Sequence, residues 1–161
     1  LFEQRTTGPL GWPVMPATVK SLRQRVETAI DAVTGFSVAK HPYNVFGRDP
    51  SSVLHKRFAV GVPRTEPVPN RRQRKTDGAV CQTLIGVTYC IRVRPKDQVA
   101  SYDEGLDAEA EIIKAVMANT STLAADASIT FAGVVGREVD PVGEWIIGDI
   151  EFTALHVLDL D

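Results

Sequence analysis

The feature that most constrains the fold is a repeated change in the spacing of apolar residues along the chain. Apolar side chains recur at every third or fourth position in residues 17–33 and again in 101–119, which predicts two helices with one buried face each. Elsewhere the apolar residues alternate, and this predicts strands that are buried on one side. The alternating stretches are 55–62, 79–94, 129–135 and 143–158.

The order of these segments predicts the fold class. A helix is followed by a short strand at 36–40, a two-strand hairpin, a second helix and a second hairpin. We therefore predict an α+β fold, in which an antiparallel or mixed sheet carries both helices packed on one face. The length of 161 residues suits a single domain. We assign this domain to residues 15–161 and expect residues 1–14, ahead of Met15, to be an N-terminal extension.

The second helix carries a specific start signal. Ser101 followed by Glu104 matches the capping box, in which the serine side chain accepts from the amide three residues on and the glutamate reaches back. Asp103 and Asp107 would then lie near the positive end of the helix dipole. The apolar stripe of this helix is predicted to consist of Leu106, Ala110, Ile113 and Met117.

Residues 63–78 separate the two strands of the first hairpin. They include three prolines, four arginines and one lysine, with almost no apolar residue. Because proline cannot donate a hydrogen bond to a neighbouring strand, we expect the preceding strand to end at Pro63. The segment 63–78 is then a long basic loop at the hairpin tip. Its candidate contact residues are Arg64, Arg71, Arg72, Arg74 and Lys75.

Charge is divided unevenly between the two parts of the chain. Residues 1–100 carry 16 Lys and Arg against 7 Asp and Glu, whereas residues 101–161 carry 2 against 13. The two parts either intermix in the fold and neutralise each other, or form opposite faces through which copies pair head-to-tail. On the second interpretation, the charges at the subunit interface are Arg92, Arg94, Asp103, Glu104, Asp107 and Glu111.

The basic loop suits two kinds of partner. Clustered cations bind nucleic-acid phosphates without reading the base sequence. No aromatic residue is interleaved with these cations to stack on bases, so a contact with DNA would be electrostatic. An acidic protein surface would bind the same cations, and the sequence leaves both partners open.

Cys81 and Cys90 lie on one predicted strand. Nine residues of extended chain separate them by about 30 Å, and their odd spacing directs them to opposite faces. They cannot form a disulfide with each other without breaking the strand. Free thiols are typical of a reducing compartment, so we expect synthesis in a cytoplasm.

The sequence contains no recognisable catalytic or metal-binding pattern. His41, His55 and His156 are scattered, without metal-ligand spacing to a cysteine or carboxylate. Gly133 and Gly136 lie between strand segments with no helix after them, which predicts a bend and not a phosphate-binding loop. No apolar run approaches the ~18 residues of a membrane-spanning helix. We therefore expect a structural protein without a catalytic site, cofactor, metal or membrane contact.

The acidic second helix and the last strand resemble one family of viral structural proteins. The helix follows a strand through Asp97-Gln98, and the last strand has the form Glu-Trp-Ile-Ile-Gly-Asp-Ile-Glu-Phe-Thr-Ala-Leu. With the order of elements, these segments are similar to the tail terminator proteins of long-tailed bacteriophages. The resemblance extends from Met15 to Leu158 and is closest from Val93 to Glu111. It rests on element order and not on a diagnostic motif.

The resemblance implies a homo-oligomeric ring, typically a hexamer, at the head–tail junction of a virion. Such a ring caps the tail tube and joins it to the head-completion or connector protein. Genomic DNA passes through its centre without sequence recognition. The alternative within the structural class is another head–tail junction component. Outside that class, the alternatives are a free-standing nucleic-acid binder and a small ligand-binding or enzymatic domain, whose pocket would gather His55, His156, Tyr89 or the carboxylates of the second helix.

Overall fold

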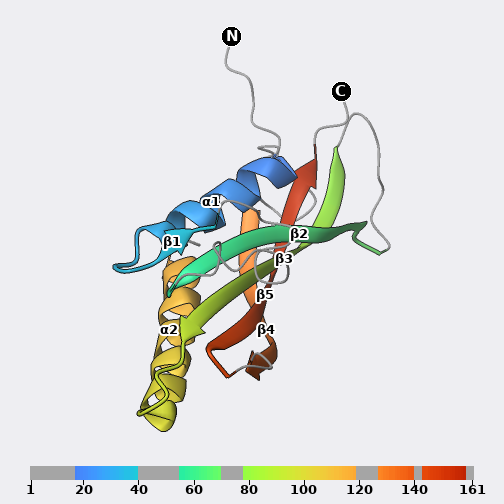
Figure 1. Cartoon of the computed structure of the whole chain (residues 1–161). Coiled ribbons are helices and arrows are strands. Elements are labelled where there is room, and N and C mark those ends of the chain that lie inside the picture. The colour runs from blue at the N-terminus through green and yellow to red at the C-terminus, as the bar shows by residue number, and fades with distance from the viewer. Residues whose placement is uncertain (1–16, 40–54, 70–77, 119–126, 140–142, 159–161) are drawn as a thin grey trace.

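The computed structural model of the chain describes residues 17–39, 55–69, 78–118, 127–139 and 143–158. Two helices and five strands lie within these ranges (Figure 1). In chain order they are α1 (Val19–Asp31), β1 (Ser37–Val38), β2 (Arg57–Pro67), β3 (Ala79–Arg92), α2 (Gln98–Ala118), β4 (Ala127–Val139) and β5 (Trp145–Leu158). The predicted order of elements and the α+β class are confirmed.

The five strands form one mixed sheet in the order β1-β2-β3-β5-β4. β1 runs parallel to β2, and all other neighbours are antiparallel. The central pair is β3 with β5, which stay in register from Ala79 opposite Leu158 to Arg92 opposite Trp145. β4 is an edge strand, because β5 is its only partner among the described residues.

Both helices pack on the same face of this sheet, as predicted (Figure 1). The side chain of Thr18 caps α1 by accepting a hydrogen bond from the amide of Ser21. The buried side of α1 follows the helical spacing and consists of Leu22, Val26, Ala29 and Ile30. The covered face of the sheet includes Val87, Tyr89 and Ile91 of β3 and Ile146, Ile150, Phe152 and Ala154 of β5.

The predicted end of β2 at Pro63 is wrong. The strand continues to Pro67, and Arg64 to Pro67 stay paired with β3 beyond a register shift between Gly61 and Arg64. In its described surroundings, this half of β2 has no strand partner on its outer side. Proline lacks an N–H donor. At an irregularity of a free sheet edge no neighbouring strand needs that donor, which explains why Pro63 is tolerated. The predicted loop 63–78 is therefore strand at 63–67, and its residues 70–77 lie outside the described ranges.

The predicted start of α2 is also wrong. The helix begins at Gln98, so Ser101 lies inside it and does not cap it. The Ser101 hydroxyl donates to the carbonyl of Asp97 at 2.8 Å and accepts from the amide of Arg94 at 2.9 Å. No acidic residue lies in the first turn, so Asp103 and Asp107 are too far along the helix to interact with the N-terminal dipole.

The buried stripe of α2 lies one position away from the predicted one. Ala110 is exposed, and Leu106, Ile113 and Met117 are only partly buried. The residues that face the sheet are Ser101, Gly105, Ala108, Glu109, Ile112 and Val116. Glu109 is thus a carboxylate in the middle of an otherwise small and apolar face.

β4 does not end near Val135 but continues to Val139 through two irregularities. Its register with β5 shifts between Phe131 and Gly133 and again between Val134 and Gly136. Such β-bulges each add a residue, so the side-chain alternation is reset. Gly133 has a φ of 142°, a conformation that side chains rarely allow. As a result, Val134 and Arg137 both lie opposite residues of the covered face of β5.

Both cysteines lie on β3 as free, buried thiols, in agreement with the prediction that they do not pair. Burial raises the pKa of the Cys81 thiol. The Cys90 sulfur lies 3.6 Å from the carbonyl oxygen of Arg57 on the neighbouring strand. Buried thiols of this kind behave as small apolar side chains.

Gly148 is the tightest position in the sheet. It lies opposite Tyr89, and a Cβ atom added at Gly148 would overlap the Tyr89 ring. We expect Gly148→Ala to lower the free energy of unfolding by about 1–3 kcal/mol, the usual cost of overpacking a core. The matched control is Gly86→Ala on β3, where nothing lies within 4 Å of the added atom. Denaturant unfolding measures both, and an equal effect of the two substitutions would contradict this account.

Candidate interaction surface

Three of the predicted interface carboxylates form an exposed row on α2. Asp103, Asp107 and Glu111 follow one another at four-residue steps, so they lie on one side of the helix. The ion pairs found among the described residues involve other carboxylates. Lys114 adds one positive charge near the end of this row. The outer side of α2 therefore presents a net negative surface.

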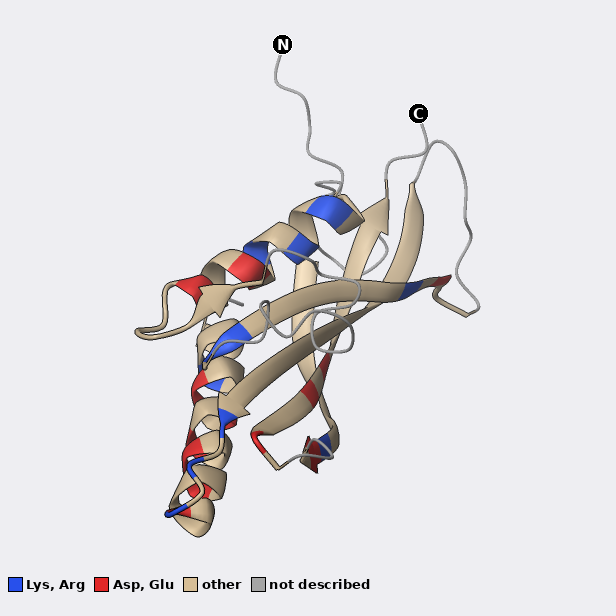
Figure 2. Ribbon diagram, viewed as in Figure 1, with Lys and Arg blue, Asp and Glu red and all other residues tan. Residues whose placement is uncertain are grey.

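Glu104 is already paired within the chain. Its Oε2 accepts a hydrogen bond from Nη1 of Arg94 at 2.9 Å, and its Oε1 lies 3.2 Å from Nε2 of His55. A cation of the basic part of the chain is thus neutralised by the acidic part of the same molecule. Figure 2 shows charges of both signs on both helices. At this point the two parts intermix, and a clean division into a basic and an acidic face is not seen.

Arg92 lies at the same end of β3. Its guanidinium carbon is 6.0 Å from the centroid of the Trp145 ring, a cation–π arrangement, and the residue is exposed. The Arg92 amide donates to Nδ1 of His55 at 3.2 Å. Arg92 therefore remains open to an acidic partner, in contrast to Arg94.

Of the candidate loop cations, the structure describes only Arg64. It lies on β2, and its Nε is 3.0 Å from Oε1 of Glu66. Both side chains are more than half exposed, so this ion pair contributes little to stability. The other four cations lie outside the described residues: Arg71, Arg72, Arg74 and Lys75.

A buried polar cluster that the sequence did not indicate joins three elements. Tyr89 of β3 is fully buried, and its hydroxyl donates to Oε2 of Glu109 on α2 at 2.7 Å. Arg137 of β4 binds the same carboxylate with two hydrogen bonds, Nε to Oε2 at 2.9 Å and Nη2 to Oε1 at 2.7 Å. Such bidentate pairs are among the strongest interactions that arginine forms with a carboxylate. The cluster fixes α2 to the centre and to the edge of the sheet.

The surroundings of this cluster favour an ionised Glu109 and a neutral Tyr89. Burial alone would raise the pKa of Glu109, but hydrogen bonds from Arg137 and Tyr89 and the nearby positive charge outweigh it and lower the pKa. Burial and the hydrogen bond to Glu109 raise the pKa of Tyr89, so its hydroxyl stays protonated. The hydrogen bonds to Glu109 and its charge raise the pKa of Arg137. This cluster was not predicted, because the expected apolar stripe lies one position away; on the true stripe of Gly105, Ala108, Ile112 and Val116, Glu109 is a carboxylate on the buried face.

His156 belongs to a second buried polar chain. Its Nδ1 lies 2.9 Å from the carbonyl oxygen of Ala17, and its Nε2 lies 2.6 Å from Oγ1 of Thr83. Thr83 is in turn 2.9 Å from Oγ1 of Thr65. With Nδ1 protonated, the ring donates to Ala17 and accepts from Thr83, so both nitrogens are satisfied. This chain of hydrogen bonds ties β2, β3 and β5 to the residue that precedes α1.

The groups that an enzymatic pocket would need are separated from one another. His55 is partly exposed beside Glu104, whereas Tyr89 and His156 are buried in different polar clusters. Within the described ranges, no group of three or more His, Cys, Asp or Glu residues is arranged to hold a metal ion. None of the helices described there is long and apolar enough to cross a membrane.

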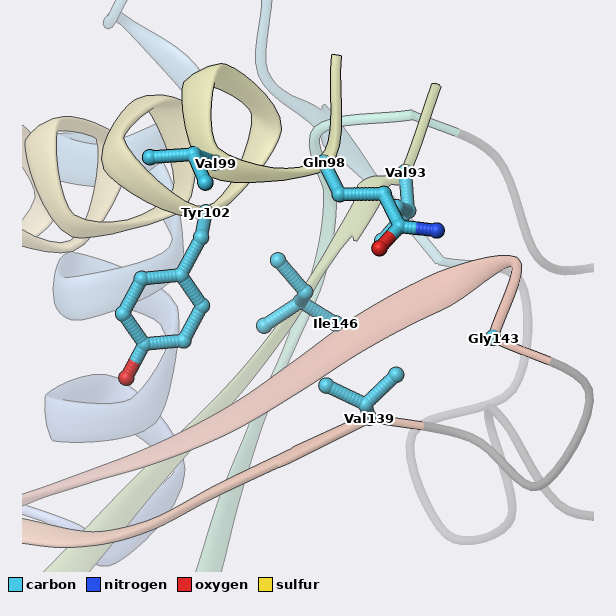
Figure 3. Close-up of a pocket in the computed structure, with 7 residues that line it drawn as sticks. All are labelled: Val93, Gln98, Val99, Tyr102, Val139, Gly143 and Ile146. Atoms are coloured by element: carbon cyan, nitrogen blue, oxygen red, sulfur yellow. The ribbon is translucent and has the colours of Figure 1, made fainter. Parts of the chain in front are cut away.

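An apolar groove lies between the start of α2 and the end of the β4–β5 hairpin (Figure 3). Its volume is about 320 Å³. The lining residues are Val93, Gln98, Val99, Tyr102, Val139, Gly143 and Ile146. Val99 is 77% exposed and Val139 55% exposed, an unusual amount of apolar surface for one end of a small domain. This groove was not predicted, because its walls come from segments about forty residues apart in the sequence.

No protein-family model matches this chain, and no curated protein matches its sequence. The resemblance to tail terminator proteins therefore rests on the residues and element order given above.

The Tyr89–Glu109–Arg137 cluster predicts a compensating pair of substitutions. Arg137→Met leaves a buried carboxylate with only the Tyr89 hydroxyl, so we expect a clear fall in melting temperature. Adding Glu109→Gln removes the unpaired charge, and the double variant should melt above Arg137→Met alone. Arg64→Met is the control, because its partner Glu66 is exposed. A double variant no more stable than Arg137→Met would contradict this prediction.

The burial of His156 predicts a loss of stability in mild acid. Burial lowers the pKa of His156 below its ordinary value of 6.5 despite the hydrogen bond with Ala17. The unfolded chain then binds this proton more readily than the folded chain, so the free energy of unfolding should fall as the pH drops below 6.5. NMR titration of the His156 ring, with thermal unfolding across the same range, measures this. A ring that titrates at or above 6.5 would contradict it.

Proposed function

We propose that the chain is the subunit of a structural ring at the head–tail junction of a tailed bacteriophage, a tail terminator. Such a ring caps the tail tube, joins it to the head-completion or connector protein, and lets genomic DNA pass. The observation that carries the proposal is the placement of two complementary features at opposite ends of β3. The groove and the start of α2, with Asp103 exposed beside it, lie at the Arg92 end, whereas the connection that carries the basic segment enters β3 at the Ala79 end.

Features at opposite ends favour a particular kind of assembly. If one end of a subunit binds the other end of the next, the contact is heterologous and repeats from copy to copy. Such contacts close into a ring when the rotation between copies allows it. Charge on both ends fixes the register of the subunits and steers their encounter. A closed ring with basic segments on each subunit would also tolerate the passage of DNA, whose phosphates bind cations without regard to sequence.

Two other functions remain as alternatives to the terminator. A head-completion or connector protein of the same junction would use the same two ends, and its position in the virion separates it from a terminator. A small ligand-binding domain would use the groove, whose volume of about 320 Å³ lies at the lower end for ligand pockets. The groove lining is almost entirely apolar and offers few polar groups to orient a ligand, which favours a protein side chain as its occupant.

The proposal predicts an oligomer that depends on salt. We expect native mass spectrometry and sedimentation at low ionic strength to detect closed multiples of the subunit mass, because the charges at the two ends attract. At about 1 M salt the screening length falls to roughly 3 Å, and the oligomer should dissociate or weaken. If the subunit assembles only on the tail tube, the oligomer will form only when tail-tube protein is added, so the same measurement is repeated with that protein. A strict monomer at both salt concentrations, with and without the tube protein, would refute the proposal, and images of the particle would place the ring.

A further inference from the structure

The groove is built from segments of net negative charge. The segments that build it, residues 93–107 and 137–146, contain seven Asp and Glu against three Lys and Arg. Two of these three cations, Arg94 and Arg137, are already bound to Glu104 and Glu109. Figure 2 shows acidic residues on both α2 and the end of the β4–β5 hairpin. An apolar floor between carboxylates suits a partner whose side chains combine an aliphatic stem with a positive end.

Arginine and lysine have such side chains. Their methylene stems pack along apolar surface while the charged group reaches the polar rim. The Tyr102 ring, which is 42% exposed, lies at the groove and offers a face for a guanidinium group. Asp103 follows Tyr102 on α2, is exposed, and could accept hydrogen bonds from the same group. Two exposed valines, Val99 and Val139, complete the apolar surface for the stems.

The chain itself contains a segment with this chemistry. Residues 68–78 carry four Lys and Arg against one Asp, and all four cations fall within 71–75. This segment joins β2 to β3, with Pro67 opposite Cys81 at its base. Its charge is opposite in sign to that of the groove.

A molecule cannot place this segment in its own groove. β3 has 14 residues, so its two ends are about 45 Å apart, with the segment at one end and the groove at the other. The connection from Pro67 to Ala79 leaves and returns at the same end of the sheet, which limits its reach to about 20 Å. This segment can therefore fill only the groove of another molecule.

We propose that the basic segment 68–78 of one copy binds the apolar, acidic-rimmed groove of a second copy. The contact is head-to-tail, and each subunit gives one segment and receives another. This inference rests on the proposed ring, because it names the contact through which neighbouring subunits associate. It assigns Tyr102 and Asp103 as the receiving residues, and Arg71, Arg72, Arg74 and Lys75 as the donated ones.

Two neutralised variants test the contact. The arm variant carries Arg71→Gln, Arg72→Gln, Arg74→Gln and Lys75→Gln, and the groove variant carries Tyr102→Ala with Asp103→Asn. Each loses one half of the contact, so each alone should associate at least tenfold more weakly than the unaltered chain by sedimentation. When the two variants are mixed, the intact groove of the arm variant can bind the intact basic segment of the groove variant. Only one such contact can form per pair, so the mixture should stop at a 1:1 heterodimer. Asp31→Asn, at the exposed end of α1, is the control and should assemble normally.

The outcomes separate this inference from the proposed function. If the unaltered chain forms rings and either variant assembles equally well, the ring proposal stands and the arm–groove contact is refuted. If both variants are monomeric and their mixture is also monomeric, the two surfaces do not meet and the inference again fails. If the unaltered chain never associates, with or without tail-tube protein, the ring and the contact fail together. Circular dichroism and thermal unfolding of each variant exclude loss of folding as the cause.

Discussion

The hydrogen-bonded cluster of Tyr89, Glu109 and Arg137 is the constraint on which the arrangement of this domain depends. It is the point at which the long acidic helix, the central strand and the edge strand are joined by directional bonds and not only by apolar contact. Apolar packing alone would let α2 slide or rotate on the sheet, because it is non-directional. A buried carboxylate bound from two sides holds the helix in one position, since losing Arg137 leaves a buried charge without compensation and losing Tyr89 removes one of its hydrogen bonds.

The position of α2 on the sheet determines which of its side chains are exposed. With Glu109 turned toward the sheet, Asp103, Asp107 and Glu111 must face outward, and Val99 and Tyr102 lie over the hairpin end and form the groove. Space for the cluster depends on Gly148, since any larger residue would collide with Tyr89. The two bulges of β4 bring Arg137 to the covered face. The proposed head-to-tail contact thus depends on groups that are not among its receiving residues.

Much of the fold followed from the spacing of apolar residues, whereas the boundaries and the site did not. The order of elements and the packing of both helices on one face of the sheet were predicted correctly, because alternation and helical spacing are local properties of the chain. Pro63 was misjudged because its effect depends on whether its side of the strand has a neighbour. Ser101 and Glu104 match a capping box, but neither side chain caps the helix. Ser101 accepts from the Arg94 amide, and Glu104 binds the side chains of Arg94 and His55.

The sequence by itself determined the fold class, the free thiols and the uneven division of charge, since these depend on residue type and local spacing. The tertiary structure alone decided where that charge is neutralised and where it remains exposed. It pairs Arg94 with Glu104 inside the molecule, leaves the row on α2 open, and sets the groove at the end of β3 opposite to the one where the chain enters from the basic segment. The physical reason is that charge and apolar surface act through distance in space, and distance between remote segments exists only once the chain has folded.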